Sequence, residues 1–227
     1  MTAEGRSLTD QLIGHGQSPY LSEGPWVKCS GVGPTKARLA AWDLVKAGAK
    51  ALVSWGSAAG LISELLPGTL ILPKEVLATN GSVYCSDPHW HKGLCKRLEA
   101  NLPLHTGPLA ESPAILTSSS EKTALFEKTG AVAVDMESAA VAAVAYEAGM
   151  PFVAIRAIAD PVEMTIPPSI LSGVDDFGRL RPFHLVKALS KRPWDLFALV
   201  RLHRGFRAAH GSLAMVARLT GSNLLAP

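Results

Sequence analysis

Two acidic residues, Glu137 and Asp160, have the type and placement of groups that could act together on a small molecule. Glu137 comes shortly after the apolar run at 131–134, which is typical of a buried strand. Asp160 follows a second apolar run, rich in β-branched residues, at 151–159. If these strands are parallel neighbours, their carboxyl ends open into one crevice, where open α/β sheets bind ligands. We therefore expect both carboxylates to face a shared binding site.

The stretch between the two acids has the composition of a helix. Residues 137–148 are rich in alanine, and Gly149 stands where a helix C-cap is expected. The order strand, helix, strand predicts an α/β fold. A chain of 227 residues with 48% hydrophobic content fits one domain with a substantial core.

Cysteine usage and hydropathy bear on the compartment. Cys29, Cys85 and Cys95 form no C-x-x-C pair, which favours reduced thiols in a cytosolic protein. The first residues lack the apolar core of a signal peptide. No apolar run reaches the roughly 18 residues of a transmembrane helix. We therefore expect a cytoplasmic protein that contacts a membrane at most peripherally.

Positive charge is concentrated at the C-terminal end. Residues 181–227 contain eight lysines and arginines but one acid, Asp195, whereas the rest of the chain is more acidic than basic. Residues 180–224 predict two helices broken at Arg192 and Pro193. Two interpretations stay open: a helix packed on the sheet with a solvated basic face, or a basic amphipathic element on anionic lipid. No recognised motif supports nucleic-acid binding, so none is expected.

The motif V-D-M-E-S at 134–138, followed by R-A-I-A-D at 156–160, resembles the signature of the nucleoside phosphorylase and nucleosidase superfamily. Within it, the chain is similar to methylthioadenosine/S-adenosylhomocysteine nucleosidases. It most resembles the hopanoid-associated phosphorylase branch, which is associated with removal of adenine from adenosylhopane. The resemblance implies a three-layer α/β/α fold around a central mixed sheet. It assigns a catalytic domain to 1–180 and a basic helical region to 181–227.

The resemblance also implies roles for the motif residues. Asp160 would protonate the leaving base at N7, and burial should raise its pKa enough to keep the proton. Glu137 would accept hydrogen bonds from the two ribose hydroxyls, and Met136 would form an apolar floor under the sugar. Arg156 would orient nearby acids, because an arginine within a strand needs a carboxylate partner; Glu137 and Glu4 are the candidates.

The N-terminal motif and the residue before the acid depart from the family pattern. Glu4, in the N-terminal M-T-A-E, resembles the family glutamate that activates the attacking water. The family strand before that motif has no counterpart in this sequence, so a truncated start and a broken pattern both stay open. The family often has serine directly before the acid, whereas Ala159 stands there here.

Small residues predict close approach of the backbone to a ligand. G-S-A-A-G at 56–60 resembles the family G-S-A-G-G, with Ala59 in place of glycine, and predicts a loop with Ser57 beside the nucleophile or an anion. Many phosphorylases of the superfamily carry arginine three residues earlier, where this chain has Ser54, which favours water over phosphate. Gly31 lies in a strand-to-helix turn that the family passes close to the sugar; tight packing is the alternative interpretation.

His89 and His91, near Cys85 and Asp87, raise the question of a metal site. Nothing else completes a ligand set, so a surface loop is expected. No metal or cofactor is predicted, with phosphate as the one conceivable co-substrate. Residues 117–120 stand where the family binds the base but carry no aromatic side chain to stack on it.

These features predict an N-glycosidase that releases adenine from a 5′-substituted adenosine, by hydrolysis or phosphorolysis. The resemblance favours adenosylhopane, and a methylthioadenosine/S-adenosylhomocysteine-type substrate is the alternative. A non-catalytic nucleoside- or lipid-binding protein and a basic membrane-surface scaffold are alternatives of other classes. The expected partners are an adenine nucleoside that is free or lipid-linked, a membrane surface contacted through the C-terminal helices, and, by analogy, a second copy of the chain.

Overall fold

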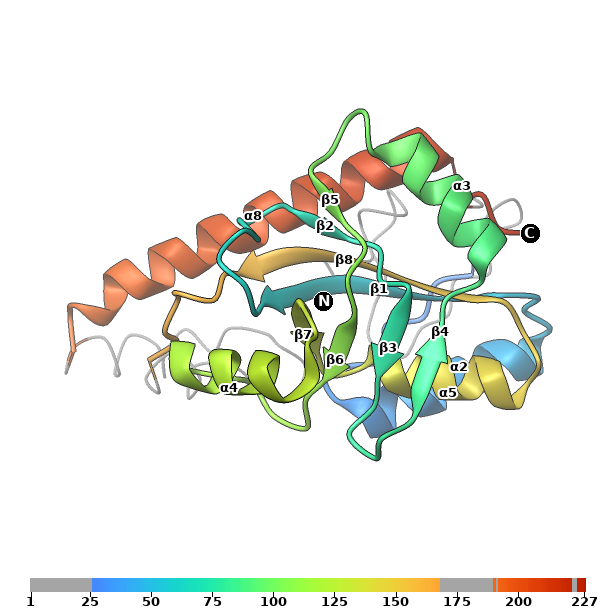
Figure 1. The fold of residues 1–227 in the computed structure, drawn as a ribbon, viewed down its shortest axis with the longest axis horizontal. Coiled ribbons are helices and arrows are strands. Elements are labelled where there is room, and N and C mark those ends of the chain that lie inside the picture. Colours follow the sequence, from blue (N-terminus) through green and yellow to red (C-terminus); the bar gives the residue numbers. More distant parts are fainter. Residues whose placement is uncertain (1–25, 168–189, 191, 222–223) are drawn as a thin grey trace.

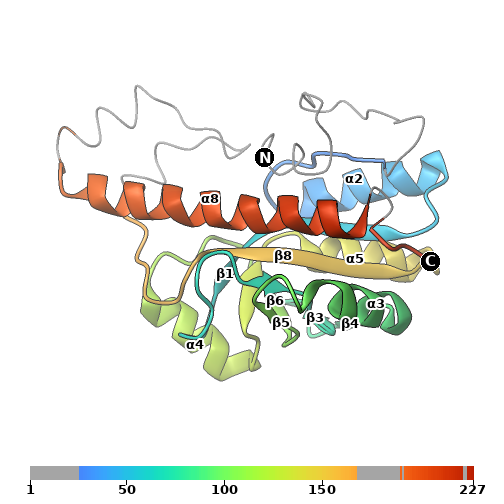
Figure 2. The same cartoon turned by 90° about the horizontal axis from the view of Figure 1, so that it is seen from above.

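The computed structural model describes residues 26–167, 190, 192–221 and 224–227. At its centre is a mixed eight-stranded sheet with strand order β4-β3-β6-β7-β1-β8-β2-β5. Helices α3 and α8 cover one face of this sheet, and α2 and α5 cover the other (Figures 1 and 2). The predicted three-layer α/β/α fold is confirmed.

The helices and strands alternate along much of the chain. The helices are α2 (Pro34–Ala47), α3 (Pro88–Leu98), α4 (Ser119–Thr129), α5 (Ser138–Glu147) and α8 (Asp195–Thr220). The strands are β1 (Leu52–Gly60), β2 (Leu70–Ile71), β3 (Glu75–Leu77), β4 (Val83–Cys85), β5 (Leu104–His105), β6 (Leu109–Glu111), β7 (Ala133–Asp135) and β8 (Phe152–Asp160).

The strands that lead to the two acids are not parallel neighbours, so that expectation is wrong. β1 lies between them, parallel to β8 and antiparallel to β7. β1 and β8 are both nine residues long, and Leu52–Ala59 pair with Phe152–Asp160 in one continuous ladder. Both strands nevertheless pair with the end of β1, where Ala59 lies between Val134 of β7 and Asp160 of β8.

Residues 56–60 form the last part of β1 and are not a loop, which corrects the prediction. Their backbone continues the ladder with β8, pairing Gly56 with Arg156 and Ala59 with Asp160. A one-residue register shift follows Ala58, so Ala159 is the extra residue on β8. The small side chains here therefore lie within a strand ladder.

Two further local predictions are wrong. Residues 26–30, which precede the turn at Gly31, are irregular and form no strand. His89 and His91 lie in α3, not in a surface loop, because α3 begins at Pro88. Asp87 caps this helix by accepting a hydrogen bond from the Trp90 backbone amide at 2.8 Å.

Helix α8 begins just after the predicted break at Pro193 and packs along β8. Gly205, Ala209 and Leu213 are buried on its inner side. At Gly205 the two backbones approach so closely that a Cβ there would lie 1.9 Å from the Ala159 carbonyl oxygen. The helix predicted for 180–191 lies outside the described residues. Within the described chain, none of the helices combines the length and apolar character needed to cross a membrane.

Candidate active site

A buried ion pair joins Arg156 on β8 to Asp135 at the end of β7. The Arg156 Nε lies 2.7 Å from Asp135 Oδ2, and the two side chains are 5% and 2% exposed. This pair spans β1, because β7 and β8 lie on either side of that strand. The expected partners of Arg156 were Glu137 and Glu4, so its pairing with Asp135 is a correction.

Two serines complete the hydrogen bonding of this ion pair. Ser138 donates to Asp135 Oδ2 at 2.5 Å and accepts from Arg156 Nε at 3.1 Å. Ser54 on β1 accepts from Arg156 Nη2 at 2.6 Å, and the Ser57 carbonyl accepts from Nη1 at 3.3 Å. A buried ion pair is stable only when such partners satisfy its remaining hydrogen-bonding groups. The network therefore fixes the end of β7 relative to β1 and β8.

This network positions Glu137, which stands at the N-cap of α5 between Asp135 and Ser138. Its Oε1 accepts a hydrogen bond from the Gly33 backbone amide at 2.9 Å. Gly33 precedes α2 with a φ of 102°, a left-handed conformation that favours glycine. Glu137 and the adjacent Met136 are both half-buried, so part of each side chain remains accessible.

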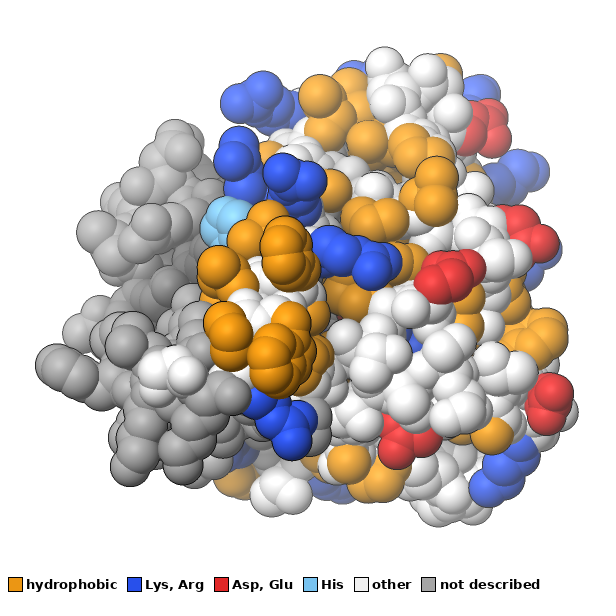
Figure 3. Space-filling view, turned by 90° about the vertical axis from the view of Figure 1, so that its left-hand side faces the viewer, with side chains coloured by type: hydrophobic (Ala, Val, Ile, Leu, Met, Phe, Trp, Pro, Cys, Tyr) orange, Lys and Arg blue, Asp and Glu red, His pale blue; other side chains and the backbone are white. Residues whose placement is uncertain are grey.

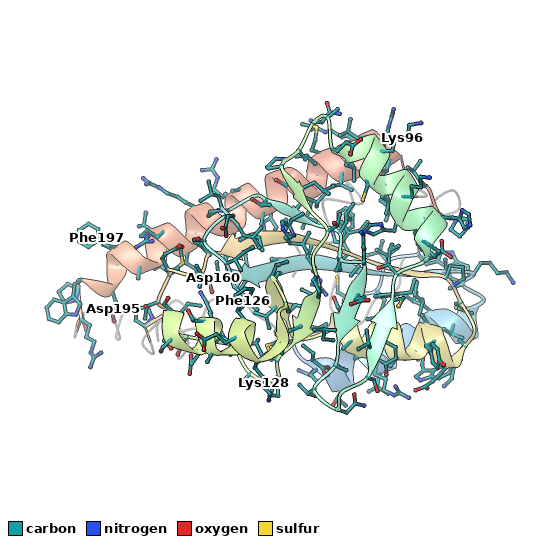
Figure 4. All side chains as sticks on the ribbon, in the orientation of Figure 1. Lys96, Phe126, Lys128, Asp160, Asp195 and Phe197 are labelled. Atoms are coloured by element: carbon teal, nitrogen blue, oxygen red, sulfur yellow. The ribbon has the colours of Figure 1, made fainter. Side chains whose placement is uncertain are left out.

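Asp160 ends β8 on the side of the sheet that faces α4 (Figure 4). Its side chain is 9% exposed, and burial raises the pKa of its carboxyl above the ordinary value for aspartate. The nearby Lys122 charge opposes that increase without cancelling it. A carboxyl group in this setting binds its proton more tightly than one in water, which is what a general acid near neutral pH requires.

Lys122 on α4 lies directly against this carboxyl group. Its Nζ is 2.8 Å from Asp160 Oδ1, and its side chain is 0% exposed. The ammonium also donates to the carbonyl oxygens of Pro161 and Met164, each at 2.9 Å. Oδ1 is buried and has no hydrogen-bond partner among the described residues, so its contact with Lys122 is an ion pair outside hydrogen-bond geometry.

The remaining predicted site residues occupy different parts of this region. Ala59 pairs with Asp160 in the β1–β8 ladder, and Ser57 lies two residues earlier on the same strand. Gly31 is buried in the turn before α2 with a φ of 89°. Glu4 lies outside the described residues, so its predicted role stays a prediction.

No cluster of three metal-binding side chains occurs in the part of the chain that the structure describes. His91 is buried, and its Nε2 lies 2.9 Å from the Leu72 carbonyl oxygen. Cys95 Sγ is 3.8 Å from both ring nitrogens of His91. The contact with Leu72 ties α3 to the residue after β2, whereas the Cys95 contact lies within the helix.

Sequence reasoning missed Asp135 and Lys122. Asp135 carried a usable signal, because an arginine inside a strand requires a buried acid and Asp135 follows a buried run. Lys122 carried none: lysine in the first half of a polar helix ordinarily faces solvent. Its burial depends on the segment after β8, which folds back so that the Ile166 amide donates to the Thr117 carbonyl at 2.8 Å.

The mixed sheet, covered by helices on both faces, defines a three-layer α/β/α protein. The sequence matches the Phosphorylase superfamily over residues 18–177, more than half of the chain. The chain therefore belongs to the Phosphorylase superfamily.

One curated relative is a 5′-methylthioadenosine/S-adenosylhomocysteine nucleosidase from Thermotoga maritima, 33% identical over 92 residues. The match covers 40% of this chain and 42% of the relative, so it spans less than half of that protein.

Solved structures share the fold over nearly the whole chain. A Neisseria meningitidis 5′-methylthioadenosine/S-adenosylhomocysteine nucleosidase bound to methylthio-immucillin-A has a TM-score of 0.68 at 18% identity and covers 97% of this chain and 95% of its own. A Helicobacter pylori mutant nucleosidase with 5′-methylthioadenosine in the active site has a TM-score of 0.66 at 17% identity, with 96% and 95% covered. Futalosine hydrolase of Helicobacter pylori has the same TM-score, identity and coverage.

Proposed function

We propose that this protein releases adenine from a 5′-substituted adenosine by cleaving the N-glycosidic bond. The observation that carries the proposal is Asp160, a buried carboxyl of raised pKa at the end of β8, in a chain of the Phosphorylase superfamily. Its neighbour across the β1–β8 ladder is the small residue Ala59. The similarity to 5′-methylthioadenosine/S-adenosylhomocysteine nucleosidases supports the substrate class.

In the proposed reaction, the bond between C1′ of the ribose and N9 of adenine breaks, and its electron pair moves to the base. Asp160 gives its proton to N7, so adenine leaves as a neutral molecule. A water molecule adds to C1′ and loses one proton. Glu137 binds the ribose hydroxyls, Met136 lies under the sugar, and Glu4 takes up the proton of the attacking water.

We propose water as the attacking group. A phosphate would need a cation to bind it, and Ser54 occupies the position where many phosphorylases of the superfamily carry arginine. Arg156 does not replace that arginine, because Asp135, Ser138, Ser54 and the Ser57 carbonyl engage its guanidinium. The buried Ser54 is itself a part of that arginine network.

Two kinds of 5′-substituted adenosine are candidates for the natural substrate. The named relatives support a small thioether, as in methylthioadenosine. The sequence resemblance supports adenosylhopane, and the α8 tip, defined as residues 192–207, adds to that case. It exposes Trp194, Phe197 and Val200, with Phe197 77% exposed. In Figure 3 a hydrophobic group lies beside Lys and Arg side chains on this side of the molecule. Such a surface suits an enzyme that meets its substrate at an anionic membrane.

Adenine release tests the proposal directly. The purified chain is incubated with methylthioadenosine, S-adenosylhomocysteine, adenosylhopane and adenosine, each with and without phosphate. Chromatography then follows free adenine and the sugar product. We expect adenine from a 5′-substituted substrate without phosphate and a free sugar product. A ribose 1-phosphate product would overturn the choice of water, and absence of adenine with every substrate would overturn the activity.

A further inference from the structure

A fully buried lysine beside the candidate acid has no role in the reaction as described so far. Lys122 is the one buried residue of α4, whose other residues face solvent or are partly buried. Burying an ammonium without a partner costs several kcal/mol in a protein interior. Lysine is therefore an improbable residue for this position unless its charge serves the groups around it.

The backbone holds Lys122 in one place. The carbonyl oxygens of Pro161 and Met164 accept two of its hydrogen bonds, and the Met164 amide donates back to Pro161 at 3.0 Å, closing the turn. At the start of α4, the Ser118 side chain and Glu121 form a capping box that fixes the first turn. The two carbonyl groups and the fixed first turn of α4 together hold the ammonium next to Asp160 Oδ1.

Oδ1 is the buried oxygen and lies against Lys122, so the proposed reaction assigns the contact with the base to Oδ2. In the family, a serine before the acid often orients it. The side chain of Ala159, at that position here, cannot form a hydrogen bond. Lys122, from a helix about forty residues earlier in the chain, is in position to take over that task.

The charged surroundings of Asp160 are otherwise sparse. Across the ladder, β1 presents Ala59, and behind the strand α8 presents Gly205. On β8 itself, Arg156 is engaged with Asp135. Among the described residues, Lys122 is therefore the charge that acts on the Asp160 carboxyl.

We propose that Lys122 is a positioning residue that holds the Asp160 carboxyl toward the leaving base and stabilises the carboxylate left after proton transfer. The inference rests on the proposed function, because it assigns Asp160 the proton for N7. Burial alone would make Asp160 a weak acid, reluctant to release its proton. A fixed positive charge at Oδ1 strengthens that acid while Oδ2 stays directed at the base.

The test compares Lys122→Met, which removes the charge at similar size, with Lys128→Met, an exposed lysine on the same helix (Figure 4). The protonated acid is the active form, so kcat/KM falls as pH rises through its pKa. Losing the lysine charge should move this alkaline limb upward by about one pH unit or more. It should also lower kcat by about 10- to 100-fold, because the acid is no longer held in place. Lys128→Met should match the wild type.

Two additions keep the test decisive if Lys122→Met folds poorly by thermal unfolding. Lys122→Gln removes the charge but retains donors for the Pro161 and Met164 carbonyls. In an Asp160→Asn background, loss of Lys122 should have no further effect on kcat. A lower kcat with an unmoved alkaline limb, or an additive loss in that background, would show a purely structural role and overturn the inference.

A measurement without turnover separates this inference from the proposed function. Carbon-13 NMR of aspartate-labelled protein follows the Asp160 carboxyl, assigned by its loss in Asp160→Asn. The carboxyl should titrate at higher pH in Lys122→Met than in the wild type. An unshifted titration overturns the role of Lys122. Absence of adenine release from the wild type, together with a shifted titration, overturns the proposed function and leaves only the electrostatic effect of Lys122 on the Asp160 carboxyl.

Discussion

At the scale of single residues, the site depends on charges whose environments differ sharply. Asp160 is a buried acid whose pKa is raised by desolvation, although Lys122 opposes the shift. Asp135 is buried against the Arg156 guanidinium, which two serines also bind. The two aspartates, on strands that flank β1, are therefore suited to different tasks: one to give up a proton, the other to hold the strands in place.

Replacing the acid should remove most of the activity. Asp160→Asn keeps the shape of the side chain but has no proton to give, so we expect adenine release to fall by about 10²–10⁴-fold. The exposed Asp43, paired with Lys28, gives the matched control Asp43→Asn, which should remain near wild type. Initial rates of adenine formation measure both variants. An Asp160→Asn rate within about threefold of the wild type would be incompatible with its role as general acid.

Removing the acid of the buried pair should act on stability. Asp135→Ala leaves Arg156 buried without its carboxylate, and we expect a loss of about 3–5 kcal/mol in the free energy of unfolding. The matched control is Glu147→Ala, which breaks an ion pair with Arg38 whose side chains are both 43% exposed. An exposed pair contributes about 0–1 kcal/mol. Urea unfolding compares the two, and equal losses would mean that burial of the first pair has no special energetic effect.

At the scale of elements, the central feature is the contact of α8 with the end of β8. The helix presents Gly205 to the Ala159 carbonyl, at a distance that leaves no room for a side chain. Ala159 directly precedes the acid, so the packing of this helix and the position of Asp160 are linked. On the opposite face, α4 holds Lys122 against the same aspartate.

Two glycines of α8 allow a matched test of this contact. Gly205→Ala would place a methyl group 1.9 Å from the Ala159 oxygen, so helix or strand must move. We expect a loss of about 1–3 kcal/mol in stability, together with reduced activity. Gly211→Ala meets nothing within 4 Å. It should stabilise the helix by about 0.5–1 kcal/mol. Thermal unfolding measures both, and a stable, fully active Gly205→Ala would contradict the close packing.

Much of this architecture follows from local sequence pattern. Two apolar runs and the alanine-rich stretch between them predict β7, β8 and α5, and Pro193 predicts the start of α8. Strand pairing could not be predicted, because a strand's own residues do not reveal which neighbour it meets. The small residues at 56–60 by themselves predict a loop, although in the structure they extend β1. The burial of Lys122 could not be predicted for the same reason, since it depends on a segment about forty residues away.

At the scale of the whole molecule, α8 extends beyond the sheet at its N-terminal end (Figures 1 and 2). Phe197 points away from the body of the protein (Figure 4). Arg192, Arg201, Arg204 and Arg207 of the α8 tip are all exposed. The acid in this stretch, Asp195, is buried. A second copy of the same basic surface would repel this one, which favours the proposed contact with an anionic lipid surface.

Vesicle sedimentation tests this surface. We expect the full chain to bind phosphatidylglycerol vesicles and to bind phosphatidylcholine vesicles weakly. Each surface arginine is worth about 1 kcal/mol near an anionic bilayer. Arg201→Ser with Arg204→Ser should therefore weaken binding by about tenfold or more, and raised salt should do the same.

Controls for this experiment come from the other helices. Phe197→Ser should reduce vesicle binding, whereas Phe126→Ser on α4 and Lys96→Ser on α3 should not, although both of these residues are exposed (Figure 4). Analytical ultracentrifugation of the same variants reports self-association. Equal binding to both kinds of vesicle, or loss of dimers with Phe197→Ser, would assign the α8 tip to another partner.

The close contact at Gly205 couples the position of α8 to the carbonyl group of Ala159, one residue before the acid. The N-terminal part of this helix extends beyond the sheet. Because there is no free space at Gly205, a displacement of that part must either tilt the helix about Gly205 or move the end of β8. A partner that binds the α8 tip would therefore act on the position of Asp160.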